Sequence, residues 1–235
     1  EGSAILGEAT NIGVTIIDDE MPGGVDPGFK LKGGANGPVF AILVDQDERI
    51  LLGGDFTRVG GVNYGHVSRL HPDGYVDSSF NIGTGLDDIV WALGVQTDRK
   101  PVPGGRYENI DGNPVVALGR LNADGVFDDT FGIDIGVDGE VFAVAVQPDG
   151  GIIIGGDFKK VAGVDAKNIA RLNPDGTLDS TFAVGSGADK PVRDIAIQHD
   201  GKLIVGGEFG MLSDAVFGKV ARLNPDGTAD SEFKP

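Results

Sequence analysis

A motif that returns at a fixed interval constrains the fold of this chain more than any other feature. Gly-Gly-Asp-Phe occupies 53–56 and recurs with variations at 104–107, 155–158 and 206–209, always 51 residues apart. Arg-Leu-x-x-Asp-Gly keeps the same phase at 69–74, 120–125, 171–176 and 222–227. Asp-x-x-Phe follows at 77–80, 128–131, 179–182 and 230–233, with an earlier copy at 26–29. We therefore expect four copies of one structural unit.

The third unit shows the predicted elements of one copy. Short apolar or β-branched runs predict strands at 141–146, 152–158, 168–172 and 177–182. The segments 147–150 and 173–176 carry Pro-Asp-Gly and predict tight turns, while 159–167 is predicted to be a loop. The first run is nearly continuous, which predicts a strand buried on both faces. Helical periodicity is absent.

Four antiparallel strands in about 50 residues are typical of a β-propeller blade. We therefore predict an all-β fold, a β-propeller built from four 51-residue four-stranded repeats. A β-solenoid is the rival, but its periods are usually about 20–30 residues. The first strands are expected to line a central channel, with four valines at equivalent positions: Val39, Val90, Val141 and Val192.

The paired glycines are assigned a packing role. Glycine supplies 40 of 235 residues, about 17%, against roughly 7% in average usage. The first glycine of each pair anchors one unit: Gly53, Gly104, Gly155 and Gly206. Because glycine has no Cβ, we expect these positions to let neighbouring blades approach closely.

Two segments carry family resemblances. The sequence Lys-Leu-Ile-Val-Gly-Gly-Glu-Phe at 202–209, followed by the motif-rich segment 221–233, resembles the delta-60 repeat, a bacterial β-propeller repeat of unknown function. This resemblance covers about 25–235. Residues 11–20, ending in Asp-Asp-Glu, are similar to the last strand and acidic tail of a Calx-β domain, so 1–24 is a separate N-terminal segment.

These resemblances imply a setting and a weak metal site. Both families occur in large secreted or surface proteins, so the resemblance implies a bacterial extracellular or cell-surface location and no catalytic residue. In Calx-β domains the acidic tail helps to bind calcium, which makes Asp18 and Asp19 candidate ligands. A lone acidic tail binds calcium weakly at best. No other cofactor is expected.

Charge and composition exclude several partners and chemistries. The chain carries 36 acidic and 19 basic residues, a formal net charge of −17. This charge disfavours nucleic acid and anionic membrane surfaces as partners. The absence of cysteine excludes disulfides, thiolate nucleophiles and cysteine zinc sites.

The second unit departs from the repeat and directs attention to possible ligand contacts. Pro101 and Pro103 stand in its second strand, and since proline cannot donate to a ladder, we expect this strand to be unpaired or pushed aside. Either this is drift, or it is a remodelled edge that docks a partner. Unusual residues in or just before the first strands of units two and four are the candidate ligand-binding residues near the channel mouth: Asp88, Trp91, Arg193 and Asp194.

A hairpin turning on 71–74 places Arg69 opposite Asp77 on one face of the sheet. The period predicts three further pairs: Arg120–Asp128, Arg171–Asp179 and Arg222–Asp230. Opposite charges facing across antiparallel strands contribute about 0.2–1 kcal/mol, and partial burial raises the cost of losing one partner. We interpret these residues as structural ion pairs rather than catalytic groups.

The sequence favours a non-enzymatic module for binding or adhesion, with a protein or a glycan as partner. The alternatives are a structural spacer and a propeller enzyme acting on carbohydrate. Acidic residues are plentiful, but none stands out as a carboxylate pair for glycoside hydrolysis. Four units could close a ring alone or form part of a larger ring completed by another chain, so self-association is also considered.

Overall fold

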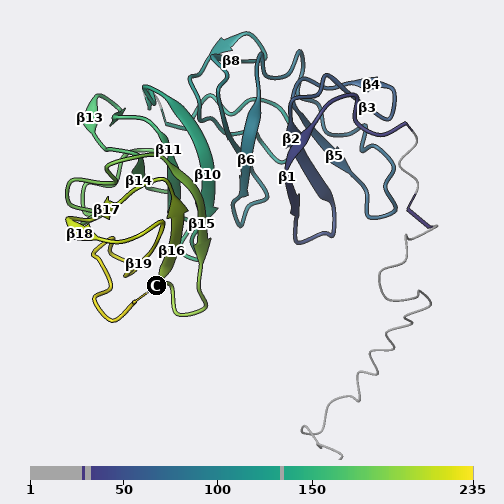
Figure 1. Ribbon diagram of the computed structural model, residues 1–235. Helices are drawn as coiled ribbons and strands as arrows, with labels where there is room; N and C mark the ends of the chain where they lie inside the picture. Colours follow the sequence, from purple (N-terminus) through teal and green to yellow (C-terminus); the bar gives the residue numbers. More distant parts are fainter. Residues whose placement is uncertain (1–27, 30–32, 133–134, 235) are drawn as a thin grey trace, which may run out of the picture.

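The computed structural model describes residues 28–29, 33–132 and 135–234, and within these ranges all regular secondary structure is β (Figure 1). The expected all-β class is confirmed. No helix in the described ranges is long and apolar enough to cross a membrane. The predicted N-terminal segment 1–24, with Asp18 and Asp19, lies outside the described residues.

Each repeat forms one antiparallel sheet, which we call a blade and number in chain order. Blade 1 comprises β1 (Val39–Val44), β2 (Ile50–Gly54) and β5 (Val67–Leu70). Blade 2 comprises β6 (Val90–Val95) and β7 (Pro101–Gly105). Blade 3 comprises β10 (Glu140–Val146), β11 (Ile152–Asp157) and β14 (Ile169–Leu172). Blade 4 comprises β15 (Val192–Ile197), β16 (Leu203–Gly207) and β19 (Val220–Leu223).

The segment predicted as a loop after each second strand is instead a two-stranded hairpin. The four hairpins are β3 (Arg58–Val59) with β4 (Val62–Asn63), β8 (Asn109–Ile110) with β9 (Asn113–Pro114), β12 (Lys160–Val161) with β13 (Val164–Asp165), and β17 (Met211–Leu212) with β18 (Ala215–Val216). One buried hydrophobic side chain per hairpin holds it on the blade: Val59, Ile110, Val161 and Leu212.

The predicted fourth strand is wrong in its extent, because it shrinks to one bridge per blade. The bridges are Leu70–Val76, Leu121–Phe127, Leu172–Leu178 and Leu223–Ala229. An aspartate directly after each bridge bends the chain away from the sheet. In blade 1 the Asp77 carboxylate accepts a hydrogen bond from the Ser79 amide at 2.9 Å, and the Asp77 carbonyl accepts one from the Phe80 amide. These local bonds compete with continued strand pairing.

The first strand of every blade contains the same bulge. Val39 pairs with Gly54 and Ala41 with Gly53, so Phe40 between them has no partner in the ladder. The same register shift occurs between 90 and 92, 141 and 143, and 192 and 194. The equivalence of the four predicted valines is therefore confirmed. A bulge re-aims the unpaired side chain, which here sets the direction of one residue per blade.

The apolar sequences of the first strands predict burial on both faces, and this prediction is wrong. In β10, Val141 and Ala143 are buried, whereas Phe142 and the last three residues are only half-buried. Successive side chains of a strand point to opposite faces, and these strands are also the inner edges of their sheets. One side of each inner strand therefore remains partly open.

The first glycine of each pair makes room for the next blade, as expected. A Cβ added to Gly53 would lie 2.7 Å from Val90 Cγ1, and one on Gly155 would lie 2.5 Å from Val192 Cγ1. Gly206 differs, since a Cβ there would meet nothing within 4 Å among the described residues. The outward face of blade 4 is therefore uncovered in the described structure.

The opposite end of the row of blades is also open (Figure 1). Ile42 of β1 is 68% exposed, whereas its equivalents Leu93 and Ile195, which face a preceding blade, are 7% and 8% exposed. Blades 1 and 4 therefore end the described row with apolar and glycine-lined faces, respectively.

The proline-bearing strand of blade 2 is neither unpaired nor displaced, contrary to the expectation. β7 pairs with β6 from Val95–Pro101 to Leu93–Pro103. The loss falls on the other side, where the third strand is reduced to the bridge Gly104–Leu118. Pro101 still accepts a hydrogen bond from the Leu121 amide at 2.8 Å. Because proline has no N–H, the reciprocal bond cannot form, and the ladder stops there.

Candidate functional site

Four side chains at the bulge positions form a row across the inner strands of all four blades. We call this set the inner-strand row: Phe40, Trp91, Phe142 and Arg193. The Phe40 and Trp91 ring centroids are 4.7 Å apart with planes tilted by 43°, and those of Trp91 and Phe142 are 6.2 Å apart, edge to face. The guanidinium carbon of Arg193 lies 4.4 Å from the Phe142 ring centroid. These are favourable aromatic and cation–π geometries.

The inner-strand row is accessible to solvent. Phe40 is 46% exposed, Trp91 and Phe142 are half-buried, and Arg193 is exposed. The bulge directs each of these side chains away from the ladder, so their stacking on one another replaces packing in the core. A contiguous, partly exposed apolar surface of this kind is characteristic of an interaction site.

Two glutamate side chains flank the row. Trp91 Nε1 donates a hydrogen bond to Glu140 Oε2 at 3.0 Å. The Arg193 guanidinium donates to Glu208 Oε1 at 3.0 Å through Nε and lowers the pKa of Glu208 below its usual range. The stacked rings therefore lie beside fixed hydrogen-bond acceptors.

The four residues singled out in the sequence occupy different places. Trp91 and Arg193 belong to the inner-strand row. Asp88 forms a bidentate ion pair with Arg106, with hydrogen bonds of 2.9 and 3.0 Å. These hydrogen bonds lower the pKa of Asp88. The Asp194 carboxylate accepts a hydrogen bond from the amide of Ile195, next to it in sequence.

Phe40 and Phe142 were missed as candidates in the sequence. Their signal was available, because each stands 51 residues from Trp91 in the repeat. A phenylalanine within an apolar strand sequence is normally predicted to be a core residue. The bulge in each inner strand is what turns these two side chains away from the core.

All four predicted Arg–Asp pairs are formed. The Nε to Oδ2 distances are 2.8 Å for Arg69–Asp77, 2.8 Å for Arg120–Asp128, 2.6 Å for Arg171–Asp179 and 2.7 Å for Arg222–Asp230. Each guanidinium also lies over a phenylalanine ring of the same blade, at 4.5–5.1 Å from the centroid for Phe80, Phe131, Phe182 and Phe233. The pairs are therefore held from two sides.

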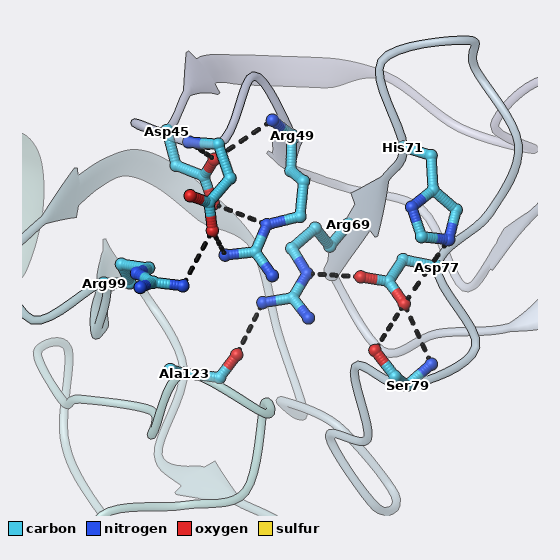
Figure 2. A network of polar contacts seen from close by, with 9 residues as sticks. Asp45, Arg49, Arg69, His71, Asp77, Ser79, Arg99 and Ala123 are labelled. Atoms are coloured by element: carbon cyan, nitrogen blue, oxygen red, sulfur yellow. Dashed lines mark hydrogen bonds and ion pairs between the residues drawn. The ribbon is translucent and has the colours of Figure 1, made fainter.

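The arginines also join adjacent blades, which the sequence analysis did not anticipate. Arg69 Nη1 donates to the Ala123 carbonyl of blade 2 at 2.5 Å (Figure 2). Arg120 and Arg171 make the equivalent bonds to Pro174 and Pro225, at 2.9 and 3.0 Å. Arg222 has no such acceptor among the described residues, and its side chain is 23% exposed, against 3% for Arg69.

The paired aspartates remain ionised to unusually low pH. Burial alone would raise the pKa of Asp77, but hydrogen bonds from Ser79 and Arg69 outweigh burial and lower it. Asp128 and Asp179 follow the same pattern. In blade 4 the hydrogen bond from Lys202, supported by Glu232 and Arg222, lowers the pKa of Asp230 to about 2.

These shifts predict acid sensitivity. The unfolded chain protonates its aspartates near their ordinary pKa of 3.8, whereas the folded chain does so at lower pH. The unfolded state therefore binds more protons in this window, and stability falls as pH drops from about 4 towards 2. Urea unfolding at pH 6, 4 and 3 should give midpoints that decrease below pH 4, with a smaller decrease in Asp179→Asn. A midpoint independent of pH over this range would contradict the prediction.

Repeated antiparallel blades joined in sequence along a row of inner strands define a β-propeller built from sequence repeats. The family model described as "Domain of unknown function (DUF5122) beta-propeller" matches residues 46–80, 96–131, 147–182 and 198–233. These matches cover more than half of the chain, and the protein belongs to this family. The predicted membership of a propeller repeat family of unknown function is confirmed, whereas the Calx-β resemblance remains a prediction.

Two solved structures are similar to this chain at low sequence identity. The WD40 β-propeller domain of Doa1 is 16% identical, with a TM-score of 0.49 over 72% of this chain and 48% of that one. Virginiamycin B lyase from Staphylococcus aureus is 12% identical, with a TM-score of 0.48 over 85% of this chain and 56% of that one. The chain thus spans about half the length of these structures. No curated protein sequence matches it.

Proposed function

We propose that this chain is a non-enzymatic binding module that holds its ligand on the inner-strand row. The observation that carries the proposal is the exposed stack of Phe40, Trp91 and Phe142, contributed by three blades and ended by Arg193 of the fourth. Aromatic walls with a few fixed polar groups are typical of ligand sites. A spacer would have no need to keep such a surface exposed.

A neutral glycan is the ligand class that this surface fits best. Aromatic faces offer flat apolar platforms. The carboxylates of Glu140 and Glu208, which accept hydrogen bonds from Trp91 and Arg193, have further lone pairs that suit hydroxyl donors. The formal net charge of −17 disfavours an anionic ligand. A protein partner is the alternative that the experiment below distinguishes.

The electrostatics support binding without catalysis. The Glu208 carboxylate, which is paired with Arg193 of the row, has a lowered rather than a raised pKa. A glycosidase needs one carboxylic acid whose raised pKa keeps it protonated for general-acid catalysis. The row and its flanking groups are therefore better suited to holding a ligand than to cleaving one. A secreted or cell-surface setting is part of this proposal.

The proposal includes self-association through the two end faces. Within the row, Leu93 of blade 2 packs against Gly53 of blade 1. Ile42 is the equivalent residue of blade 1, and it is exposed. Gly206 is the equivalent of Gly53 in blade 4, and no described residue packs on it. A second copy of this chain could thus extend the row of blades by the packing already used within it.

The single tryptophan allows a direct test of the inner-strand row. Binding of a neutral oligosaccharide selected from a glycan array should change Trp91 fluorescence. By calorimetry, Trp91→Ala and Phe142→Ala should each weaken binding at least about tenfold, a loss of about 1.4 kcal/mol. Tyr75→Ala, which removes an exposed aromatic residue on a turn, should bind as the unaltered protein does.

Three outcomes would contradict the assignment of a glycan ligand to the row. If glycan affinity is the same in Trp91→Ala and Phe142→Ala, the ligand does not lie on the row. If the array yields no ligand while a protein partner binds in a Trp91-dependent manner, the row is a protein-binding surface. Absence of any ligand for either class would favour the spacer.

A further inference from the structure

A cavity of about 530 Å³ lies in the outer part of blade 3, beside the loop that leads to blade 4. Its apolar wall is formed by Ala166, Ile169, Leu178, Phe182 and Val184. This volume is within the range of small-molecule sites, which are about 300–1,000 Å³. The cavity is separate in residues from the inner-strand row.

The repeat shows that blade 3 carries the smallest side chain beside this space. Ala166 occupies a position that carries larger side chains in the other blades, namely Tyr64, Val115 and Phe217. The backbone is equivalent at all four positions, because each amide donates to the carbonyl seven residues earlier, over 2.8–3.0 Å. The four side chains therefore start from equivalent backbone positions and point into equivalent parts of their blades.

Blade 1 shows what fills the corresponding space. Tyr64 is only 7% exposed and belongs to the same core cluster as Phe80 and Ile82. These two residues correspond to Phe182 and Val184 of the cavity wall. Burial, and to a lesser degree the charge of Asp77, raises the pKa of Tyr64. Asp179, the equivalent of Asp77, also lines the cavity.

We propose that the cavity of blade 3 binds a small molecule through a phenolic ring, which takes the place that the Tyr64 side chain holds in blade 1. The walls favour an uncharged ring, because the Asp179 carboxylate is already paired with Arg171 at 2.6 Å. The cavity is larger than one ring, so substituents of the ligand extend towards Lys167 and Ser186 at its margin. This site is independent of the proposed glycan-binding function.

The test uses p-cresol, which reproduces the tyrosine side chain. Titration should shift the methyl NMR signals of Ala166, Ile169, Leu178 and Val184 in a saturable manner. Ala166→Tyr supplies the ring covalently and should weaken p-cresol binding at least tenfold while raising the thermal midpoint. Val216→Tyr adds the same residue at an exposed hairpin position in blade 4 and should leave binding unchanged.

Two further variants keep the proposal testable if Ala166→Tyr folds poorly. Ala166→Val installs the residue of blade 2 and should weaken binding to an intermediate degree. Tyr64→Ala should open the equivalent space in blade 1 and add a second set of shifts, around Ile82. The proposal is overturned if p-cresol shifts none of the cavity methyls up to its solubility limit, or if folded Ala166→Tyr or Ala166→Val binds it undiminished.

Discussion

Arg69→Ala is expected to lower the free energy of unfolding by about 3–5 kcal/mol, because it leaves the buried Asp77 carboxylate without its cation. Both side chains of this pair are only 3% exposed. The variant also removes the bond from Arg69 to the Ala123 carbonyl of blade 2 (Figure 2). It removes the contact with the Phe80 ring as well. For a chain of this length we expect the thermal midpoint to fall by about 10 °C.

Arg222→Ala is the matched control for this prediction. Arg222 makes the same pair within its blade, but Asp230 also holds Lys202 at 2.8 Å and the arginine reaches no further blade in the described structure. Partial exposure weakens such a pair, so the control should lose much less stability than Arg69→Ala does. Thermal and urea unfolding of both variants decide the matter. Equal losses would show that the bond between blades contributes nothing.

Gly155→Val should destabilise the protein by about 3 kcal/mol through overpacking between blades 3 and 4. A Cβ at this position would lie 2.5 Å from Val192 Cγ1 and 3.0 Å from Ile195 Cδ1, so the two blades must separate. Valine is otherwise favoured in strands, which means that the loss arises from the blade contact alone. The thermal midpoint should fall by about 6–12 °C.

Gly206→Val makes the same change at the equivalent position of blade 4. Because a Cβ there meets nothing within 4 Å, the variant should be as stable as the unaltered protein or slightly more stable. Sedimentation velocity of this variant also tests self-association, which should weaken if a second copy packs on this face. A large loss of stability in Gly206→Val, or none in Gly155→Val, would refute the glycine packing argument.

Features that depend on neighbouring residues were predicted well from the sequence. The Arg–Asp pairs are eight residues apart across a tight turn, so the turn alone brings Arg69 opposite Asp77. Strand positions follow from apolar runs bounded by Pro-Asp-Gly turns. The fourth strand was overestimated for a local reason as well, since the Asp77 side chain competes with strand pairing for backbone amides.

The consequences of the prolines in blade 2 required the structure. Proline removes a donor, but whether that matters depends on which side of the strand the missing N–H would face. Pro101 and Pro103 face the third strand, so pairing with the inner strand survives. Backbone N–H groups point alternately to the two sides of a strand, and the sequence alone does not show to which side a given residue's N–H points.

By itself, the sequence determined the unit: its period, its turns, its glycine pairs and the ion pairs within each hairpin, because these rest on contacts between residues close along the chain. Tertiary structure decided what happens between units. Phe40, Trp91 and Phe142 meet because a bulge turns each of them out of its ladder and adjacent blades hold them one stacking distance apart. The bond from Arg69 to Ala123 and the cavity beside Ala166 arise in the same way, from how blades and core side chains pack in three dimensions, which a repeat period does not encode.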